Sequence, residues 1–378
     1  MDRSFAEDRL RAAARSINCR VATSSDDGDL RALLRGNPMG GWVSVAMERE
    51  PSYFVPLVTG DEHDAIIARD AATGCAVGMC ARTIRPAYID GEIRSLGYIG
   101  ELRIAADHRH RFHIIREGFQ TLRRELHRPD LTPFYLTAIV ADNAPARRLL
   151  EAELPGKPTY GPIADCTTLA MRTGRGAVAP AMRADEDDLA DISDCLARNH
   201  ARYQFAPLWT EADIRDAAQA GGPGTRDFLL HRAHGKIAGC LALWDQSRAR
   251  QAVIRGYRPQ IAWLRPWLNA MSAFTGIPPL PRSGEALRLV YLSFMAIDGD
   301  DPAIACKLVA AGLREARRRG FDLALLAMAE DNPMLPALRQ SFRARDYRSK
   351  LYLVHWPDGR EAVEDLATRI VHVEAGLL

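Results

Sequence analysis

The sequence predicts an α/β (α+β) fold of two tandem domains, each with a mixed, mostly antiparallel sheet flanked by helices. The first observation is a repeat, because residues 134–143 and 323–332 are both apolar strands that end in Asp-Asn. The second copy begins 189 residues after the first, which is half of the 378-residue chain. In both halves this strand follows an amphipathic helix, and that helix follows another apolar strand. The repeat indicates two copies of one domain, at residues 1–174 and 178–378.

Composition restricts the class of protein. Hydrophobic residues make up 47% and charged residues 26% of the chain, and the formal net charge is only +2. These values are typical of a globular protein and give no reason to expect nucleic acid or a membrane as a partner. The seven cysteines include no CxxC pair, which favours free thiols in a reducing compartment. No signal peptide is evident at the start, so we expect a cytoplasmic protein, either a monomer or a homodimer.

Local patterns place the elements of the first half in order. The helix expected at 111–126 has apolar residues spaced by three and four, which is the stripe of an amphipathic helix. An apolar run, a turn containing Gly74 and a second apolar run predict a hairpin. The expected order is a helix at 26–34, hairpin strands at 64–70 and 74–81, a strand at 98–105, a helix at 111–126, a strand at 134–143, a short helix at 146–154 and a strand at 166–171.

The second half repeats this order after a linker expected at 173–178. It also inserts a stretch rich in Trp and Pro between residues 255 and 285, which we interpret either as a lid or substrate wall or as packing against the other half. The expected elements are a helix at 185–201, hairpin strands at 228–232 and 237–243, a strand at 287–297, a helix around 305–316, a strand at 323–332, a short helix at 335–342 and a strand at 350–356.

Three motifs of the first half carry a family resemblance. Glu101-Leu-Arg-Ile104 ends a strand, residues 109–114 lead into a helix, and Asn143 begins a short helix after the next strand. These motifs and the element order resemble the GNAT (N-acetyltransferase) superfamily. The tandem layout is similar to that of two-domain members such as mycothiol synthase.

The resemblance implies acetyl-CoA as co-substrate, bound where a loop enters a helix. Unpaired backbone N–H groups and the positive end of the helix dipole suit the pyrophosphate there. The family's small loop residues are replaced here by bulky ones. The second copy has three aspartates at 298–301, which would cap a helix well but repel a pyrophosphate, so we expect the first half to bind CoA. The implied cofactor contacts are Leu102, Arg103, Ile104, Arg109, His110, Arg111, Phe112, His113, Ile114 and Asn143.

The resemblance also implies which residues move protons. Glu101 stands where the family's general base lies, although it could equally be a structural partner of Arg103. The family's usual acid, a Tyr after Asn143, is replaced by Leu150. Tyr98 is therefore our candidate acid, with Tyr160 as an alternative, and either could simply be a packed aromatic residue.

The implied function is an N-acyltransferase that moves an acetyl group from acetyl-CoA to a small amine. We expect no metal, because the histidines at 108, 110 and 113 alternate with arginines and fit no zinc spacing. The alternative is a non-catalytic tandem protein that serves as a ligand sensor or interaction scaffold, which the bulky loop residues and Leu150 favour. A third possibility, transfer of an aminoacyl group from tRNA, would need a basic groove.

Overall fold

The computed structural model describes residues 17–58, 61–174, 181–275 and 280–378. Part of the predicted linker (175–178), Pro278 and Pro279 of the insert, and the chain start used to predict the absence of a signal peptide lie outside this part. The strands of the first half are β1 (Ile17–Val21), β2 (Val43–Glu48), β3 (Glu62–Asp70), β4 (Ala76–Ile89), β5 (Glu92–Ile104), β6 (Leu131–Val140) and β7 (Thr159–Arg172). The helices of the first half are α2 (Asp27–Gly36), α3 (Phe112–Glu125) and α4 (Ala144–Glu151).

The second half contains the same series with additions. Its strands are β8 (Met182–Arg183), β9 (Ala206–Pro207), β10 (Phe228–Ala233), β11 (Lys236–Trp244), β12 (Gln251–Tyr257), β13 (Leu289–Ile297), β14 (Leu323–Ala329) and β15 (Ala344–His355). Its helices are α5 (Leu189–His200), α6 (Glu211–Gln219), α7 (Pro259–Thr275), α8 (Pro302–Arg318), α9 (Leu335–Ser341) and α10 (Arg360–Glu364). Every helix and strand expected from the sequence is present, and several strands are longer than expected because their ends are polar.

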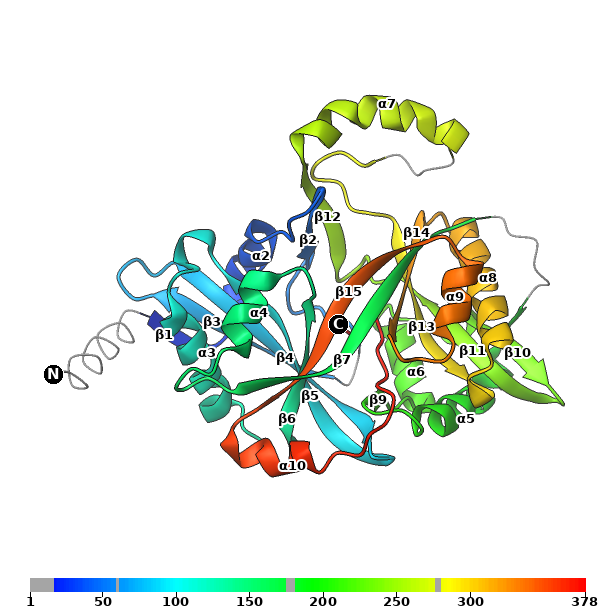
Figure 1. Cartoon of the computed structure of the whole chain (residues 1–378), viewed down its shortest axis with the longest axis horizontal. Coiled ribbons are helices and arrows are strands. Elements are labelled where there is room, and N and C mark those ends of the chain that lie inside the picture. Colours follow the sequence, from blue (N-terminus) through cyan, green and yellow to red (C-terminus); the bar gives the residue numbers. More distant parts are fainter. Residues whose placement is uncertain (1–16, 59–60, 175–180, 276–279) are drawn as a thin grey trace.

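One continuous sheet runs through both halves (Figure 1). Within the described residues it has 13 strands, in the order β1-β3-β4-β5-β6-β15-β7-β14-β13-β11-β10-β8, with β9 paired to β4. Neighbouring strands are antiparallel except for β5–β6 and β13–β14. The predicted mixed, mostly antiparallel sheet with flanking helices is therefore confirmed.

The last strand of each half is exchanged with the other half. β15 lies between β6 and β7, and its Leu353 stands opposite Leu136 on one side and Gly161 on the other. β7 in turn pairs with β14, where Leu169 stands opposite Leu326. Each half thus supplies a strand to the sheet of its neighbour. The division of the chain into 1–174 and 178–378 stays a proposal, and the exchanged strands cross it.

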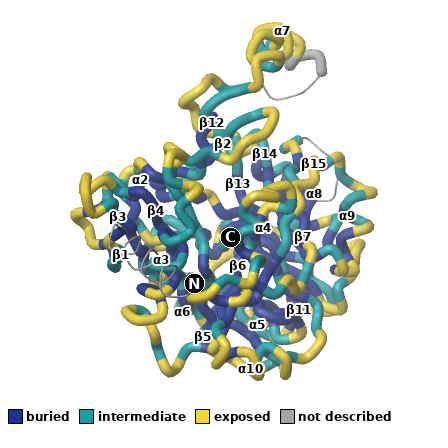
Figure 2. The backbone as a smooth tube through the Cα atoms, turned by 60° about the vertical axis from the view of Figure 1, so that its left-hand side comes forward, coloured by how far each residue is buried: buried dark blue, intermediate teal, exposed yellow. Residues whose placement is uncertain are grey.

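Helices cover both faces of the sheet, which buries its apolar side chains (Figure 2). Successive residues of a strand point to opposite faces. Ile66 of β3 accordingly packs in the cluster of Phe119 on α3, whereas Ile67 packs in the cluster of Leu30 on α2. The apolar stripe of α8 is buried in the same way, and truncating its fully buried Leu308 to Ala should cost about 2–5 kcal/mol.

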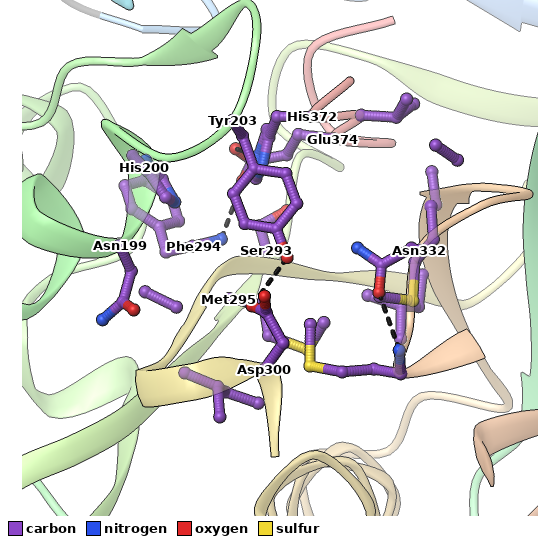
Figure 3. A pocket seen from close by; sticks show the side chains of 18 of the residues that line it. Asn199, His200, Tyr203, Ser293, Phe294, Met295, Asp300, Asn332, His372 and Glu374 are labelled. Atoms are coloured by element: carbon purple, nitrogen blue, oxygen red, sulfur yellow. Dashed lines mark hydrogen bonds and ion pairs between the residues drawn. The ribbon is translucent and has the colours of Figure 1, made fainter. Parts of the chain in front are cut away.

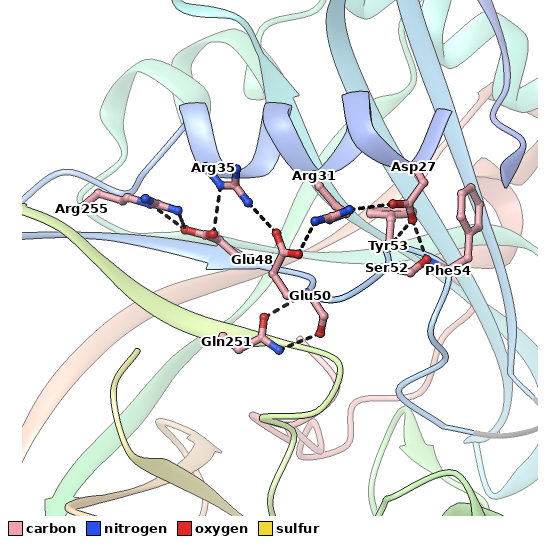
Figure 4. Close-up of polar contacts among 10 residues, drawn as sticks. All are labelled: Asp27, Arg31, Arg35, Glu48, Glu50, Ser52, Tyr53, Phe54, Gln251 and Arg255. Atoms are coloured by element: carbon pink, nitrogen blue, oxygen red, sulfur yellow. Dashed lines mark hydrogen bonds and ion pairs between the residues drawn. The ribbon is translucent and has the colours of Figure 1, made fainter. Parts of the chain in front are cut away.

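A two-stranded ribbon of β2 and β12 joins the halves and leads to α7, which projects from the body (Figures 1 and 2). A charge network holds the base of the ribbon to α2 (Figure 4). The carboxylate of Glu48, which is 3% exposed, accepts hydrogen bonds from Arg255 Nε at 2.6 Å and Arg35 Nε at 3.3 Å. Trp263 and Trp267 of α7 are 80% and 75% exposed. The expectation that the insert packs against the other half is therefore wrong for these residues.

Candidate functional site

The sheet of the first half opens between β5 and β6. Their parallel pairing ends at Tyr98 and Leu136, although β5 runs on to Ile104 and β6 to Val140. Glu101 has a φ of +52°, and the β4–β5 register shifts opposite it, between Met79 and Ala81. Such a bulge bends a strand away from its neighbour. Beyond Tyr98, this edge of β5 faces no partner strand within the described part of the chain and could pair with a ligand.

Glu101 lies within a polar cluster at this bulge. Tyr53 Oη donates a hydrogen bond to Glu101 Oε2 at 2.7 Å. Arg49, which is 2% exposed, places Nη1 3.6 Å from Glu101 Oε1 and 3.3 Å from a ring nitrogen of His63. Burial alone would raise the pKa of Glu101, but Arg49, His63 and the Tyr53 hydrogen bond together hold it below its usual value. The carboxylate is therefore ionised at neutral pH and ready to accept a proton.

Tyr98 lies at the last paired position before the gap. Burial raises the pKa of its phenol to about 12, and the negative charge of Glu101 acts in the same direction. The phenol therefore keeps its proton at neutral pH. A Cβ atom on Gly100 would lie 2.9 Å from the Tyr98 ring, so the glycine leaves room for that ring.

The second half contributes Arg250 to the same region. The positive charge of Arg250 acts to lower the pKa values of both Tyr98 and Glu101. Its guanidinium donates to the Gly376 carbonyl at 2.9 Å and to Gln246 Oε1 at 2.9 Å, which fixes its position. The candidate site is thus built from both halves.

The start of α3 carries basic residues and no side-chain cap. Its N-cap residue is Arg111, and its first turn contains no acidic residue. The first N–H groups of a helix have no partner within the helix, so this end suits an anion. Arg109 is exposed and donates to Asn37 Oδ1 at 2.9 Å, while Arg111 pairs with Asp70 at 3.1 Å.

The second half has an equivalent gap, but it is filled (Figure 3). Pairing of β13 with β14 ends at Tyr291 and Leu325, and Phe294 has a φ of +56° at a matching register shift. The backbone N–H of Phe294 donates to Glu374 Oε1 at 2.8 Å. Residues 371–374 line what remains, a cavity of about 30 Å³, which is room for about two waters.

The start of α8 is also occupied, in contrast to that of α3. Asp301 Oδ1 accepts from the N–H of Ala303 at 2.7 Å and of Ile304 at 3.4 Å, and Pro302 has no N–H to offer. Asp298 pairs with Arg198, and Asp300 pairs with Arg202. The expected capping of the helix is therefore confirmed for Asp301 but not for Asp298 and Asp300, and the first N–H groups of α8 are already bonded to Asp301.

Comparisons with solved structures identify the fold. N-myristoyltransferase of Saccharomyces cerevisiae with bound myristoyl-CoA matches with a TM-score of 0.58 at 13% identity, over 90% of this chain and 82% of that one. A second structure of this enzyme, with bound myristoyl-CoA and inhibitors, matches with a TM-score of 0.59 at 13% identity, over 95% of this chain and 87% of that one. A third match is a GCN5-related glucosamine N-acetyltransferase region of a fungal multi-domain β-N-acetylglucosaminidase. Its TM-score is 0.55 at 12% identity, over 89% of this chain and 38% of that one.

The chain has the GNAT fold. No protein-family model matches the sequence, and no curated protein matches it in sequence either. The fold therefore rests on structural likeness, and that likeness confirms the predicted GNAT-like fold.

The GNAT fold places most of the predicted site residues on one stretch of the first half. Glu101 and Tyr98 lie at the bulge, and Leu102, Arg103 and Ile104 continue along the open part of β5. Burial lowers the pKa of Arg103, whose Nη1 donates to the Leu102 carbonyl. The ion pair of Glu101 is with Arg49, so the proposed structural pairing with Arg103 is wrong.

The remaining predicted contacts lie around the helix starts. His110 is exposed, Phe112 is partly buried against the α3 cluster, and the pKa of His113 is lowered by burial and by Arg111. Asn143 caps α4, with Oδ1 accepting from Ala146 N at 3.3 Å. Binding of a cofactor by these residues stays a prediction.

Ile114 is the one buried residue among the predicted loop contacts at 109–114. Its side chain is buried, 3% exposed, and a Cβ atom on Gly78 would lie 3.0 Å from it. Its backbone N–H already donates to the Arg111 carbonyl at 3.1 Å. The side chain also lines a small pocket together with Leu102, Arg103 and Ile104, so binding of a cofactor by Ile114 stays a prediction.

Sequence reasoning missed Arg49, Tyr53, His63 and Arg250. Tyr53 lies outside every helix and strand predicted from the sequence, and 48 residues separate it from Glu101. Charged and aromatic residues without periodicity give no local signal, so only the fold brings them together. Among the described residues, no group of three or more His, Cys, Asp or Glu is placed to hold a metal ion.

Proposed function

We propose that the protein is an acyl-CoA-dependent N-acyltransferase that moves an acetyl group from acetyl-CoA to a small amine. The observation that carries the proposal is the open gap at Glu101, next to an uncapped, basic helix start. The second half has neither feature. Glu374 bonds to the bulge in its gap, and Asp301 caps its helix start. The bound myristoyl-CoA of the structural neighbour supports a CoA thioester as the donor.

The proposed binding mode follows from the free donors. The pyrophosphate would face the N–H groups at the start of α3 together with Arg109 and Arg111. The pantetheine arm would pair with the edge of Leu102 and Ile104 that faces no β6 residue, as an added strand does, and would compete with Arg103 for the Leu102 carbonyl. The thioester would then lie near Glu101.

The proposed chemistry needs two proton transfers. Glu101 accepts a proton from the amine, directly or through a water, as the amine nitrogen forms its bond to the thioester carbon. The carbon–sulfur bond then breaks, and the CoA thiolate takes the proton of the Tyr98 phenol. Glu101 is ionised and Tyr98 is protonated at neutral pH, so both start in the required state.

Ligand-dependent stability tests this proposal. A ligand present at 100 times its dissociation constant adds about 2.7 kcal/mol to the free energy of unfolding. We expect acetyl-CoA to raise the thermal midpoint, and Arg109→Glu to remove the shift. The matched control is Asp301→Ala, which should leave the shift intact. A shift lost in the control instead would place the CoA site in the second half.

The acyl chain and acceptor are tested next. Myristoyl-CoA in a parallel titration distinguishes a short-chain donor from a long-chain one. Release of free CoA thiol in the presence of a panel of small amines would establish transfer. A second candidate, a non-catalytic ligand sensor or scaffold, is favoured by Leu150, which is 5% exposed in the core where the family places its acid. No stabilisation at millimolar acyl-CoA would favour this candidate.

A further inference from the structure

Helix α7 exposes an unusually apolar face. The exposed fractions are 80% for Trp263, 75% for Trp267, 40% for Leu264, 40% for Leu268 and 44% for Met271. The spacing between successive positions alternates between one and three residues, which places all five side chains on one side of the helix. A soluble helix normally turns such a face toward a core, and a contiguous exposed apolar patch marks an interaction site.

The opposite side of α7 is already occupied by its own chain. Arg265 Nη1 donates to the Pro281 carbonyl at 2.9 Å, and Asn269 exchanges hydrogen bonds with the backbone of Leu280. The returning segment therefore covers the polar side and leaves the apolar side outward. The β2–β12 ribbon is held to the body by the charges around Glu48 (Figure 4). Helix α7 lies beyond this ribbon and apart from the two halves (Figure 1), and its apolar side chains remain exposed.

The arm, defined as residues 251–288 without 276–279, is locally basic. It contains five arginines and one acidic residue, Glu285, and α7 itself has no acidic residue. Arg255 and Arg288 are paired with Glu48 and Asp322 outside the arm, so the excess rests on the other three arginines. Arg258 and Arg282 are exposed, and the Arg258 guanidinium lies 6.0 Å from the ring centre of Trp42. Trp42, on the neighbouring β2 side of the ribbon, is itself 60% exposed. The near-neutral net charge of the whole chain hides this local excess.

We propose that α7 docks on an anionic lipid membrane and lies in the plane of its interface. An interfacial helix combines a buried apolar face rich in Trp and Leu with basic residues that attract anionic headgroups. Tryptophan is favoured at the boundary between acyl chains and headgroups. A second copy of the chain fits less well, because two arms face to face would bring arginines against arginines.

The arm starts at the candidate site, which gives docking a consequence. β2 ends at Glu48, next to Arg49, and β12 begins directly after Arg250. Arg49 contacts Glu101, and Arg250 lies in the same region. A membrane-bound arm would therefore hold the gap of the first half near the lipid surface. The docking itself does not depend on acyl transfer.

Vesicle flotation of the full chain tests the proposal. We expect binding to vesicles of phosphatidylcholine with about 30% phosphatidylglycerol, weaker binding to pure phosphatidylcholine, and loss of the difference at high salt. Trp263→Ser with Trp267→Ser should weaken binding about tenfold or more, because two aromatic side chains lose their apolar contact. Arg258→Glu with Arg282→Glu should weaken binding to the anionic vesicles only.

The matched control is Tyr347→Ser on β15, an aromatic residue that is 52% exposed outside the arm. It should leave vesicle binding unchanged, and all variants should keep the thermal midpoint of the parent protein. Absence of flotation at millimolar lipid, or flotation unaffected by the tryptophan variant, would overturn the proposal. A concentration-dependent dimer that the tryptophan variant abolishes would instead assign the face to a second copy.

Discussion

The two halves share one backbone irregularity and use it differently. Glu101 and Phe294 both have positive φ angles at a bulge, and both lie where the pairing of two parallel strands has ended and a gap has opened. In the first half the bulge carries a carboxylate and the next helix start is uncapped. In the second half the bulge carries a buried phenylalanine, its N–H is bonded to Glu374, and Asp301 caps the helix. The bulge thus belongs to the fold, whereas the chemistry depends on what fills the gap.

The largest expected effect is on the rate of acyl transfer. Glu101→Gln removes the proposed base but keeps a hydrogen-bond acceptor for Tyr53, so the protein should fold. We expect kcat to fall about 10²- to 10⁴-fold with unchanged acyl-CoA stabilisation. Measuring CoA thiol release and the ligand-dependent midpoint on the same variant checks this. An unchanged rate would leave Glu101 as a structural carboxylate.

The next effect concerns the filled gap. Glu374→Ala leaves the buried N–H of Phe294 without an acceptor, and the free energy of unfolding should fall by about 2–3 kcal/mol. Glu374→Gln is the control, because its amide oxygen can still accept the bond. Urea denaturation of both variants measures the difference. Equal losses would show that the charge, not the Phe294 bond, matters.

Acid should weaken both halves through one buried histidine in each. Burial and His372 lower the pKa of His200 from 6.5 to about 4, and burial and Arg49 lower that of His63 to about 4. The unfolded chain binds these protons first, so the stability is complete above pH 6.5 and is lost as the pH falls toward 4. For His200 the loss reaches about 2 kcal/mol at pH 5.

Substitution separates the two contributions to the acid sensitivity. His200→Gln and His63→Gln should each reduce the loss of stability between pH 7 and pH 5, and the double variant should reduce it further, since the sites share no partner. The exposed His234→Gln serves as the control. Denaturation curves at the two pH values give the result, and a loss unchanged by His200→Gln would contradict the assignment.

The smallest effect is at the helix starts. Asp301→Ala removes the cap of α8 and should cost about 1 kcal/mol. Arg111→Ala at the equivalent position of α3 should cost less, because its side chain makes no cap hydrogen bond. Thermal midpoints without ligand measure both changes. Equal costs would remove the contrast between an open and a capped helix start.

Local patterns in the sequence predicted the helices and strands, but not how the strands pair. The spacing of apolar residues in 111–126 defines α3 whatever surrounds it. Residues 350–356 were expected to end the second half, and no local feature shows that β15 inserts beside β6. Matching the two halves by their helix starts would place Leu292 opposite Leu102, which is three residues out of register with the bulges, because the loop before α8 is shorter than the loop before α3. The bulges pair Glu101 with Phe294 instead.

The candidate site could be predicted only as far as it lies on one strand. Glu101 and Tyr98 are three residues apart, so a strand pattern with a family resemblance was enough to select them. Arg49 and Tyr53 contact Glu101 from a segment about 50 residues earlier, and the charge of Arg250 acts on the pKa of Glu101 from the other half. Such interactions depend on the tertiary fold and cannot be predicted from the residues that neighbour Glu101 along the chain.

The exchange of β15 also sets the order in which the protein can be completed during synthesis. β6 ends at Val140, but its neighbour β15 begins at Ala344, about 200 residues later. At the usual elongation rates this delay lasts roughly 10 to 40 s. During that time the nascent chain carries an unpaired sheet edge, which is a template for pairing with other chains. A ribosome-bound first half therefore needs shielding that the finished molecule does not.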